Sequence, residues 1–153
     1  MFEALQLRTR VPAAEAKTVK QIIPSSFAEQ HPLTILVAED NKINQKVITQ
    51  ILRKLGYEPD VTEDGLEAVS AVQAKGYDIV LMDMQMPVMD GLEATAAIRR
   101  MDIKQPSIIA LTANTLSGDR EECLSAGMDD YLGKPIKMDD LLNTLRHWSL
   151  VRA

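Results

Sequence analysis

The sequence predicts an α/β fold in which a parallel sheet of five strands carries helices on both faces. Two observations support this prediction. Between residues 33 and 148, short apolar runs alternate with longer segments whose apolar residues recur at helical spacing. Strands buried on both faces need nearly continuous apolar runs, and regular strand–helix alternation is typical of parallel sheets because each crossover is a helix.

Five segments have the composition of strands. They are residues 33–38 (LTILVA), 57–61 (YEPDV), 77–82 (YDIVLM), 107–112 (SIIALT) and 128–132 (MDDYL). The second is weakly apolar and contains Pro59, which cannot donate to a strand ladder, so we place it at an edge of the sheet. With right-handed crossovers, this edge position favours the strand order 2-1-3-4-5 of flavodoxin-like doubly wound sheets, a (βα)5 arrangement.

The helices are predicted from apolar residues at helical spacing and from capping residues. They are residues 41–56, 64–76, 90–101, 117–127 and 137–148. In the first helix, Asn41 is the expected N-cap and Gly56 the expected residue after the C-terminus. In the second, Leu66, Val69 and Val72 are expected on one face. The last helix is expected to carry five residues in register, Met138, Leu141, Leu142, Leu145 and Trp148.

The string DGLEA occurs at residues 64–68 and again at residues 90–94. Asp followed three residues later by Glu is a capping-box pattern, in which the Asp accepts from early helix N–H groups and the Glu reaches back to the cap. Two helices with the same N-terminal chemistry explain the recurrence without a duplication.

Length and charge bound the domain organisation. The chain has 153 residues and a net charge of −5, which suits one domain with an appendage. Residues 1–32 are about neutral and contain three prolines, so we interpret them as a linker or the remnant of a preceding kinase domain. Residues 33–150 are the predicted domain. The chain has a single cysteine, which excludes an internal disulfide and a cysteine-based zinc site.

Composition also narrows the partners and the compartment. The acidic domain has no basic cluster, which argues against direct contact with nucleic acid. The sequence has no apolar run long enough to span a bilayer and no secretory signal. We therefore expect a cytoplasmic location and no membrane contact by this domain, although a longer parent chain could be tethered to a membrane.

Charged and polar residues stand where the predicted strands end. Glu39 and Asp40 follow the first strand, Asp83 the third and Lys134 the fifth, and Thr112 ends the fourth. Ligands of such sheets bind at the carboxyl ends beside the point where the strand order reverses. Three neighbouring carboxylates repel one another unless a cation lies among them, and Mg²⁺ prefers carboxylate and phosphate oxygens. The set indicates phosphoryl transfer to a carboxylate, with Mg²⁺ as the cofactor.

The stretches that carry these residues resemble the receiver domain of two-component signalling. The similarity runs from about Thr34 to Trp148 and rests on ILVAEDNKINQ, LMDMQMPVMDG, IIALTAN and CLSAGMDDYLGKP. The EDN-x-x-N-Q start and the MD-x-QMP-x-MDG core are most similar to the receivers of hybrid sensor histidine kinases. No phosphate-binding glycine loop is present, so the phosphoryl donor is not expected to be a nucleotide bound here.

The resemblance implies a role for each matching residue. Asp83 would be phosphorylated by transfer from a phosphohistidine. Asp40, Asp83 and the backbone carbonyl of Gln85 would bind Mg²⁺, with Glu39 acting mainly through a metal-bound water. Methionines at positions 84, 86 and 89 are expected to line the loop that covers the site, or simply to pack within it.

The resemblance also implies a switch. Thr112 and Lys134 would contact the phosphoryl group, and Tyr131 would turn inward as Thr112 moves. The bond between Lys134 and Pro135 is expected to be cis. The response would be read on the surface formed by the fourth helix, the fifth strand and the fifth helix.

The implied partners are the phosphohistidine domain of a histidine kinase, a histidine phosphotransfer protein, or both. In related receivers they dock on the first helix, where Ile43, Val47 and Ile48 form a wide apolar stripe; that all three face the sheet is an equal alternative. The receiver alone is expected to be a phosphoacceptor with at most slow autodephosphorylation. The parent chain is expected to be a hybrid histidine kinase, with no output domain after Trp148.

Two other functions fit part of the pattern. A metal-dependent phosphatase with an aspartyl-phosphate intermediate would use the same nucleophile, but it normally needs a second acid two residues on, where this chain has Gln85. A pseudo-receiver, a binding module that is not phosphorylated, would usually lack part of the set of acids, Thr and Lys that is complete here. The phosphoacceptor function is therefore favoured.

Overall fold

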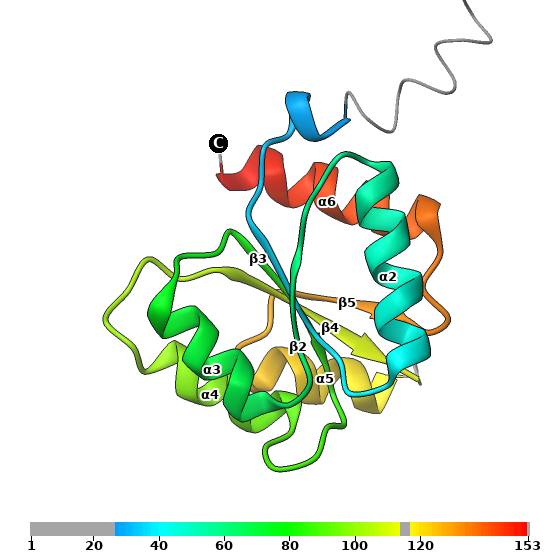
Figure 1. Ribbon diagram of the computed structural model, residues 1–153. Coiled ribbons are helices and arrows are strands. Elements are labelled where there is room, and N and C mark those ends of the chain that lie inside the picture. The colour runs from blue at the N-terminus through cyan, green and yellow to red at the C-terminus, as the bar shows by residue number, and fades with distance from the viewer. Residues whose placement is uncertain (1–26, 114–116, 153) are drawn as a thin grey trace, which may run out of the picture.

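The computed structural model describes residues 27–113 and 117–152, and it contains the predicted five-stranded sheet (Figure 1). The strands are β1 (Ile35–Ala38), β2 (Asp60–Thr62), β3 (Ile79–Asp83), β4 (Ser107–Thr112) and β5 (Asp130–Gly133). Their order is β2-β1-β3-β4-β5 and every neighbouring pair is parallel. This confirms the predicted order, including the edge position of the second strand.

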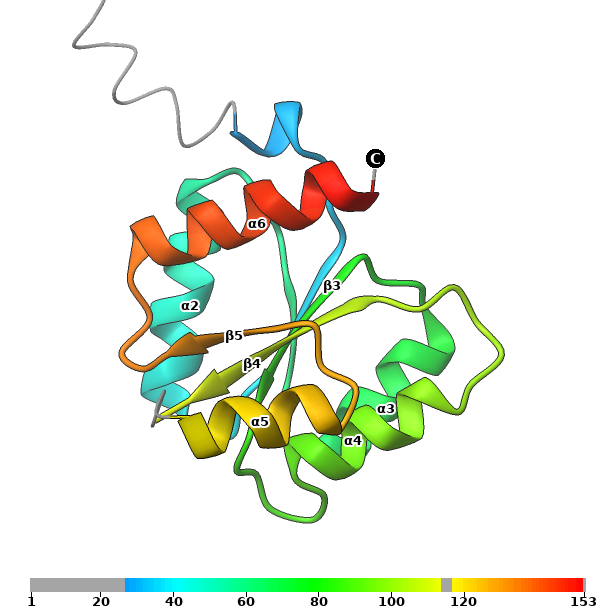
Figure 2. The ribbon, with the colours of Figure 1, turned by 180° about the vertical axis from the view of Figure 1, so that it is seen from behind.

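Helices cover both faces of the sheet. On one face lie α2 (Lys42–Lys54) and α6 (Met138–Arg152), and on the other lie α3 (Gly65–Ala74), α4 (Gly91–Arg99) and α5 (Ser117–Ser125). Figure 2 shows the same division from behind. None of the helices in the described part of the chain is long and apolar enough to cross a membrane.

The continuous apolar runs of the central strands follow from this layering. In β1, Ile35 and Val37 pack in the core that α2 and α6 cover, whereas Leu36 packs in the core under α3 to α5. In β3, Leu81 and Met82 divide between the two cores in the same way. Successive side chains of a strand point to opposite faces, so both faces can be apolar only if no position is polar.

The predicted helix starts are confirmed in detail. The Asn41 side chain accepts hydrogen bonds from the backbone N–H groups of Ile43 and Asn44. The second DGLEA segment forms a complete capping box, with Asp90 accepting from the Glu93 N–H and Glu93 accepting from the Asp90 N–H. In the first segment the Asp caps its helix, but the Glu accepts from the N–H of the residue before the cap.

The predicted inner face of the second helix is wrong in one residue. Leu66 is 51% exposed, and the buried face of α3 is formed by Gly65, Ala68 and Val72. The N–H of Gly65 donates to the carbonyl of Met89 at 2.9 Å, and a Cβ on Gly65 would lie 2.2 Å from that oxygen. This close approach directs the small residues of α3 inward and leaves Leu66 in solvent.

The packed part of the chain begins before residue 33. Phe27 is 5% exposed and contacts Tyr57 edge to face, with ring centroids 6.2 Å apart. The N–H of Ala28 donates to the carbonyl of Leu55, and the Tyr57 hydroxyl donates to the carbonyl of His31. These contacts join residues 27–31 to the loop after α2, while the division of the chain at residue 33 stays a prediction.

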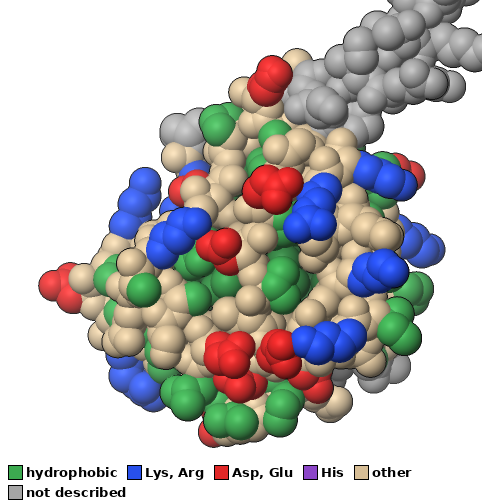
Figure 3. All heavy atoms as spheres, in the orientation of Figure 1, with side chains coloured by type: hydrophobic (Ala, Val, Ile, Leu, Met, Phe, Trp, Pro, Cys, Tyr) green, Lys and Arg blue, Asp and Glu red, His purple; other side chains and the backbone are tan. Residues whose placement is uncertain are grey.

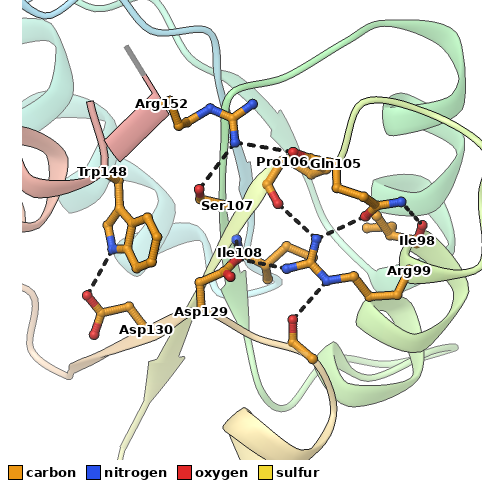
Figure 4. Close-up of polar contacts among 11 residues, drawn as sticks. Ile98, Arg99, Gln105, Pro106, Ser107, Ile108, Asp129, Asp130, Trp148 and Arg152 are labelled. Atoms are coloured by element: carbon orange, nitrogen blue, oxygen red, sulfur yellow. Dashed lines mark hydrogen bonds and ion pairs between the residues drawn. The ribbon is translucent and has the colours of Figure 1, made fainter. Parts of the chain in front are cut away.

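A polar network holds the amino ends of the strands (Figure 4). Arg99 ends α4, and its guanidinium donates to the Gly127 carbonyl at 2.8 Å and to the Pro106 carbonyl and Gln105 Oε1, each at 2.9 Å. The same guanidinium pairs with Asp129 Oδ2 at 2.7 Å. One side chain therefore joins the ends of α4 and α5 to the start of β4.

The last helix extends four residues beyond its predicted end. Within this extension, Arg152 donates to the Ser107 hydroxyl at 3.3 Å and to the Gln105 carbonyl at 3.2 Å. Trp148 donates from Nε1 to Asp130 Oδ2 at 3.0 Å (Figure 4). Because these partners come from the sheet and the loop before it, the helical pattern alone could not reveal the extension.

Candidate functional site

A cleft of about 900 Å³ lies at the carboxyl ends of the strands. The five residues that the sequence placed at strand ends all line it: Glu39, Asp40, Asp83, Thr112 and Lys134. Ligand oxygens of Glu39, Asp40 and Asp83 lie within 4.8 Å of one another. The parallel register of β1, β3 and β4 brings these residues together, since neighbouring strands end at the same edge.

The position of Asp83 is fixed by the close approach of α4. Asp83 is the last residue of β3 and only 4% exposed. The N–H of Gly91, at the start of α4, donates to the carbonyl of Met84, and a Cβ on Gly91 would lie 2.2 Å from the Asp83 carbonyl oxygen. A glycine at this point lets the helix begin directly against the end of the strand.

One ammonium group serves two carboxylates. Lys134 Nζ lies 2.9 Å from Asp83 Oδ1 and 3.1 Å from Glu39 Oε1. The Lys134–Pro135 peptide bond is cis, as expected. Burial opposes the charged form of Lys134, but its interactions with the Asp83 and Glu39 carboxylates outweigh this effect and raise its pKa. Lys134 is therefore a permanent cation in this cleft.

The charge of the Glu39 carboxylate is only partly compensated by its neighbours. Its side chain is fully buried, and one of its oxygens accepts from the Asn41 N–H at 3.1 Å. The other, Oε1, lies near Lys134 but forms no hydrogen bond with the described residues. Burial and then the neighbouring Asp83 carboxylate raise the pKa of Glu39 from 4.5 to about 7. The ionised form thus needs more positive charge than Lys134 provides.

These residues fit a hard divalent cation. The donor set consists of oxygens, as Mg²⁺ requires, and the cleft offers one buried carboxylate oxygen without a hydrogen bond. Three carboxylates against one ammonium leave a negative excess at the place where the cation would lie. Gln85 also lines the cleft, and its N–H donates to Asp83 Oδ1 at 3.3 Å.

The predicted switch residues lie on neighbouring strands. Thr112 ends β4 and is 3% exposed, while Tyr131 lies in β5 and is half-buried against the core under α3 to α5. The register places Ala110 beside Tyr131 and Thr112 beside Gly133. Their roles in a switch stay predictions.

The methionines divide between lining and packing. Met84 and Met86 line the cleft, and both pack against the core under α3 to α5. Met89 packs against the same core, and its carbonyl accepts from the Gly65 N–H. Met82 is fully buried within β3.

The apolar stripe of the first helix splits between two faces, which corrects one predicted docking residue. Ile43 is 73% and Val47 39% exposed, whereas Ile48 is 1% exposed and belongs to the core. Adjacent helical residues point about 100° apart, so Val47 and Ile48 cannot share a face. Ile48 aligns instead with Leu52 and Leu55, four and seven residues on, which are both buried.

Charge is distributed unevenly over one face of the domain (Figure 3). Asp and Glu side chains gather along the lower edge of this face, and Lys and Arg side chains line its right-hand side, where Figure 1 places α2. The helix α2 has the sequence KINQKVITQILRK, which contains four basic residues and no acid. The exposed Ile43 and Val47 thus lie on a basic helix beside an acidic cleft.

Two contributions to the site were missed from the sequence. The need for glycine at position 91 follows from contacts across the fold, although the recurring Asp-Gly start was visible. Gln45 donates from its side-chain amide to the backbone carbonyl of Glu39, and a Gln one turn into the helix that follows the acidic pair was the available signal.

Comparison with known proteins identifies the family. The family model of the response regulator receiver domain matches residues 35–146. Hybrid signal transduction histidine kinase B of Dictyostelium discoideum is 47% identical over 120 residues, which is 71% of this chain and 6% of that kinase. Two-component system protein A of Emericella nidulans is 41% identical over 141 residues, or 90% of this chain and 20% of that protein. The chain thus spans a small part of these relatives.

Solved structures agree. The receiver domain of a sensor histidine kinase of Pseudomonas aeruginosa, described with a magnesium ion coordinated in its active site cleft, is 48% identical with a TM-score of 0.72. The alignment covers 76% of this chain and 97% of that one. The receiver domain of Ssk1 of Saccharomyces cerevisiae, crystallised with the histidine phosphotransfer protein Ypd1, is 32% identical with a TM-score of 0.74, over 79% and 91% of the two chains. This chain belongs to the response regulator receiver domains and is a receiver domain of a two-component phosphorelay.

Proposed function

We propose that this receiver domain accepts a phosphoryl group on Asp83 from a phosphohistidine. The observation that carries the proposal is the position of Asp83, which lies in the cleft at 2.9 Å from Lys134 Nζ and beside two further acids. A carboxylate oxygen of Asp83 attacks phosphorus, the bond between phosphorus and the imidazole nitrogen breaks, and that nitrogen keeps the electron pair. The products are an acyl phosphate on Asp83 and a free histidine.

Glu39, Asp40, Asp83 and the carbonyl of Gln85 would hold Mg²⁺. When bound, the cation neutralises negative charge on the acids and on the phosphoryl oxygens. Lys134 now contacts an Asp83 oxygen. Once phosphorylation removes the charge of that carboxylate, Lys134 pairs with a phosphoryl oxygen instead. Thr112 donates its hydroxyl to another phosphoryl oxygen.

Phosphorylation then shifts the conformational equilibrium of the surface formed by α5, β5 and α6. The new acceptor oxygens attract the Thr112 hydroxyl, and Tyr131 on the neighbouring strand follows it inward. The free energy of the response is the difference between the contacts of the phosphoryl group in the two states. The segment between β4 and α5, which connects Thr112 to this surface, lies outside the described residues.

The phosphodonor docks on the exposed face of α2. Ile43 and Val47 supply apolar contact at the rim of the cleft, and the basic residues of α2 favour a donor helix with acidic neighbours. A histidine phosphotransfer protein and the phosphohistidine domain of a histidine kinase both present a histidine on a helix and are the proposed partners. By likeness to the curated relatives, the parent chain is a hybrid histidine kinase.

The two rival functions have less support. A phosphatase that uses an aspartyl phosphate would need a general acid beside Asp83, and position 85 carries an exposed Gln. A pseudo-receiver would have no use for an acidic triad that one lysine leaves short of positive charge.

Phosphorylation can be tested by intact mass spectrometry. The protein is incubated with Mg²⁺ and a small acyl phosphate, beside Asp83→Asn and Asp102→Asn as a matched control at an exposed acid. We expect one phosphoryl adduct that needs Mg²⁺, that hydroxylamine removes, and that only Asp83→Asn abolishes. If no donor and no divalent cation yields an adduct on the folded wild type, the phosphoacceptor function is wrong and the pseudo-receiver becomes the better proposal.

Docking on α2 is tested by a pair of isoleucines. Ile43→Ala should weaken binding of a phosphotransfer protein about 5- to 10-fold with little change in stability, because it removes exposed apolar contact. Ile48→Ala should instead lower the free energy of unfolding by about 2 to 4 kcal/mol, as expected for a core deletion. Equal binding by Ile43→Ala and the wild type, measured by calorimetry, would place the docking surface elsewhere.

A further inference from the structure

The peptide unit between Glu39 and Asp40 is held in a specific way. The ladder between β1 and β2 ends at the pair of Ala38 and Thr62, and the N–H of Glu39 still donates to the Thr62 carbonyl at 3.0 Å. Strand β2 ends there, so the carbonyl of Glu39 lies beyond the ladder. It accepts a hydrogen bond from the side-chain amide of Gln45. A side chain thus continues the pairing where the strand stops.

This carbonyl belongs to the one peptide plane that connects the two acids. A peptide unit is planar, so a hydrogen bond that holds its carbonyl restrains the Cα atoms on both sides, here those of Glu39 and Asp40. Both residues contribute to the acidic cluster in the cleft. A hydrogen bond to this oxygen therefore orients two of the three carboxylates at once.

Gln45 is itself well placed to act as an anchor. It lies in the first turn of α2, and its own N–H donates to the Asn41 carbonyl at 2.9 Å. Asn41 caps the helix through its side chain, and its N–H donates to Glu39 Oε2 at 3.1 Å. Gln45 therefore holds the turn from Glu39 to Asn41 against the start of α2 with both its backbone N–H and its side-chain amide.

We propose that Gln45 is a positioning residue for the acidic pair, and that its side-chain amide sets the cation affinity and the phosphorylation rate of the cleft without touching the cation or Asp83. This inference rests on the proposed function of the site. Groups that orient metal ligands typically change metal affinity about 10- to 100-fold when removed, and a single hydrogen bond to a partly buried turn belongs near the lower end. We therefore expect an effect of about 5- to 20-fold on the Kd for Mg²⁺.

The experiment compares two glutamines of the same helix. Gln45→Met keeps the length of the side chain but removes the donor, and Gln45→Glu replaces the donor with an acceptor. Gln50→Met and Gln50→Glu are the matched controls, because Gln50 is an exposed residue of α2. For each protein, the Kd for Mg²⁺ is measured by calorimetry, the rate of phosphorylation by an acyl phosphate by intact mass, and folding by circular dichroism and thermal unfolding.

We expect both Gln45 variants to stay folded, to bind Mg²⁺ about 5- to 20-fold more weakly, and to be phosphorylated more slowly at limiting Mg²⁺. Near-saturating Mg²⁺ should restore the rate, which a general loss of folding would not allow. The Glu variant is decisive, since its added negative charge by itself would strengthen cation binding. Weaker binding by this variant, measured at a pH at which the acids of the cleft are ionised, would indicate a misplaced ligand.

Several outcomes would overturn the inference. If Gln45→Met binds Mg²⁺ with wild-type affinity, Gln45 does not position the acids. Tighter Mg²⁺ binding by Gln45→Glu in the same experiment would support that conclusion. Equal losses in the Gln50 controls would assign the effect to the helix in general. If the wild type itself binds no divalent cation and takes no phosphoryl group, then the proposed function fails, and this inference fails with it.

Discussion

The two ends of the sheet both contain partly buried charges, but they satisfy them differently. At the amino end, the Arg99 guanidinium donates to three oxygens and pairs with Asp129, whose carboxylate also accepts from the Ile108 N–H at 2.8 Å. At the carboxyl end, Lys134 is the one cation among the described residues that pairs with Glu39 and Asp83, each of which also accepts from a backbone N–H group. At the amino end the Arg99 and Asp129 charges compensate each other, whereas the carboxyl end has an excess of negative charge.

This difference separates stability from function. A paired charge in a low-dielectric setting stabilises only while its partners are present, so the amino end resists change. A cluster of like charges lowers the free energy of unfolding through repulsion, and a bound cation, with or without a phosphoryl group, relieves that repulsion. The carboxyl end therefore responds to ligands. Removing the charge of a carboxylate should therefore lower the free energy of unfolding at the amino end and raise it at the carboxyl end.

The largest expected effect is at the amino end. Arg99→Met should lower the free energy of unfolding by about 2 to 3 kcal/mol, because it leaves three backbone or amide oxygens without this donor and Asp129 without its cation. The matched control is Arg100→Met, an exposed neighbour that should stay within about 0.5 kcal/mol of the wild type. Urea unfolding measures both. Equal effects of the two substitutions would show that the network adds nothing to stability.

The second prediction is that removing a charge at the carboxyl end raises the free energy of unfolding, and that the gain depends on pH. The folded protein keeps Glu39 protonated up to about pH 7, whereas the unfolded chain loses that proton near pH 4.5. Between these values the folded state binds more protons, so the contribution of Glu39 to the free energy of unfolding falls as the pH rises. Glu39→Gln should then be more stable than the wild type by about 2 kcal/mol at pH 8, and about equal at pH 4.

This comparison is made by urea unfolding in the presence of a chelator, so that no divalent cation compensates the charge. The control is the Asp129→Asn variant, in which the advantage at high pH should be absent because its carboxylate is paired. A constant difference between Glu39→Gln and the wild type from pH 4 to pH 8 would refute the charge excess at Glu39.

The third prediction adds the cation. At a Mg²⁺ concentration ten times its Kd, the free energy of unfolding of the wild type should rise by about 1.4 kcal/mol through binding to the folded state. Asp40→Asn removes one acid of the cleft and should lose most of this gain, whereas Asp129→Asn at the other end should keep it. Thermal unfolding with and without Mg²⁺ gives the answer. A gain that survives in Asp40→Asn would place the cation outside the acidic cleft.

The smallest effects should separate the two hydroxyls at the ends of β4. Ser107, at the amino end, accepts from Arg152 at 3.3 Å, and Ser107→Ala should cost less than about 1 kcal/mol while leaving the phosphorylation response intact. Thr112→Val should permit phosphorylation, but it should weaken the structural response. Amide NMR shifts in β5 before and after phosphorylation report on this. An unreduced response in Thr112→Val would remove Thr112 from the switch.

The fold could be predicted from the sequence because its signals are local. The bounds of β4 are those expected, residues 107–112, since a buried strand must be apolar throughout its length. The start of α4 followed from the Asp-x-x-Glu pattern, which forms a complete capping box. The helical period could also have predicted that Ile48 points inward, because Ile48, Leu52 and Leu55 share one face.

Other features depend on contacts between distant segments. The exposure of Leu66 follows from the approach of Gly65 to Met89, which no local pattern encodes. The length of α6 depends on the hydrogen bonds of Arg152 to residues of the β4 start. The tether from Gln45 to the Glu39 carbonyl spans one turn in sequence, yet it matters only because β2 ends at Thr62.

The sequence by itself determined the strand order, and with it which acids, hydroxyl and lysine would meet at the carboxyl edge of the sheet. Apolar periodicity and turn chemistry are properties of neighbouring residues, so they can be read along the chain. Only the tertiary structure decided that one lysine bridges Glu39 and Asp83, and that burial and Asp83 raise the pKa of Glu39 to about 7. Electrostatic free energies depend on distances and on burial, and both are set by the packing of segments far apart in the sequence.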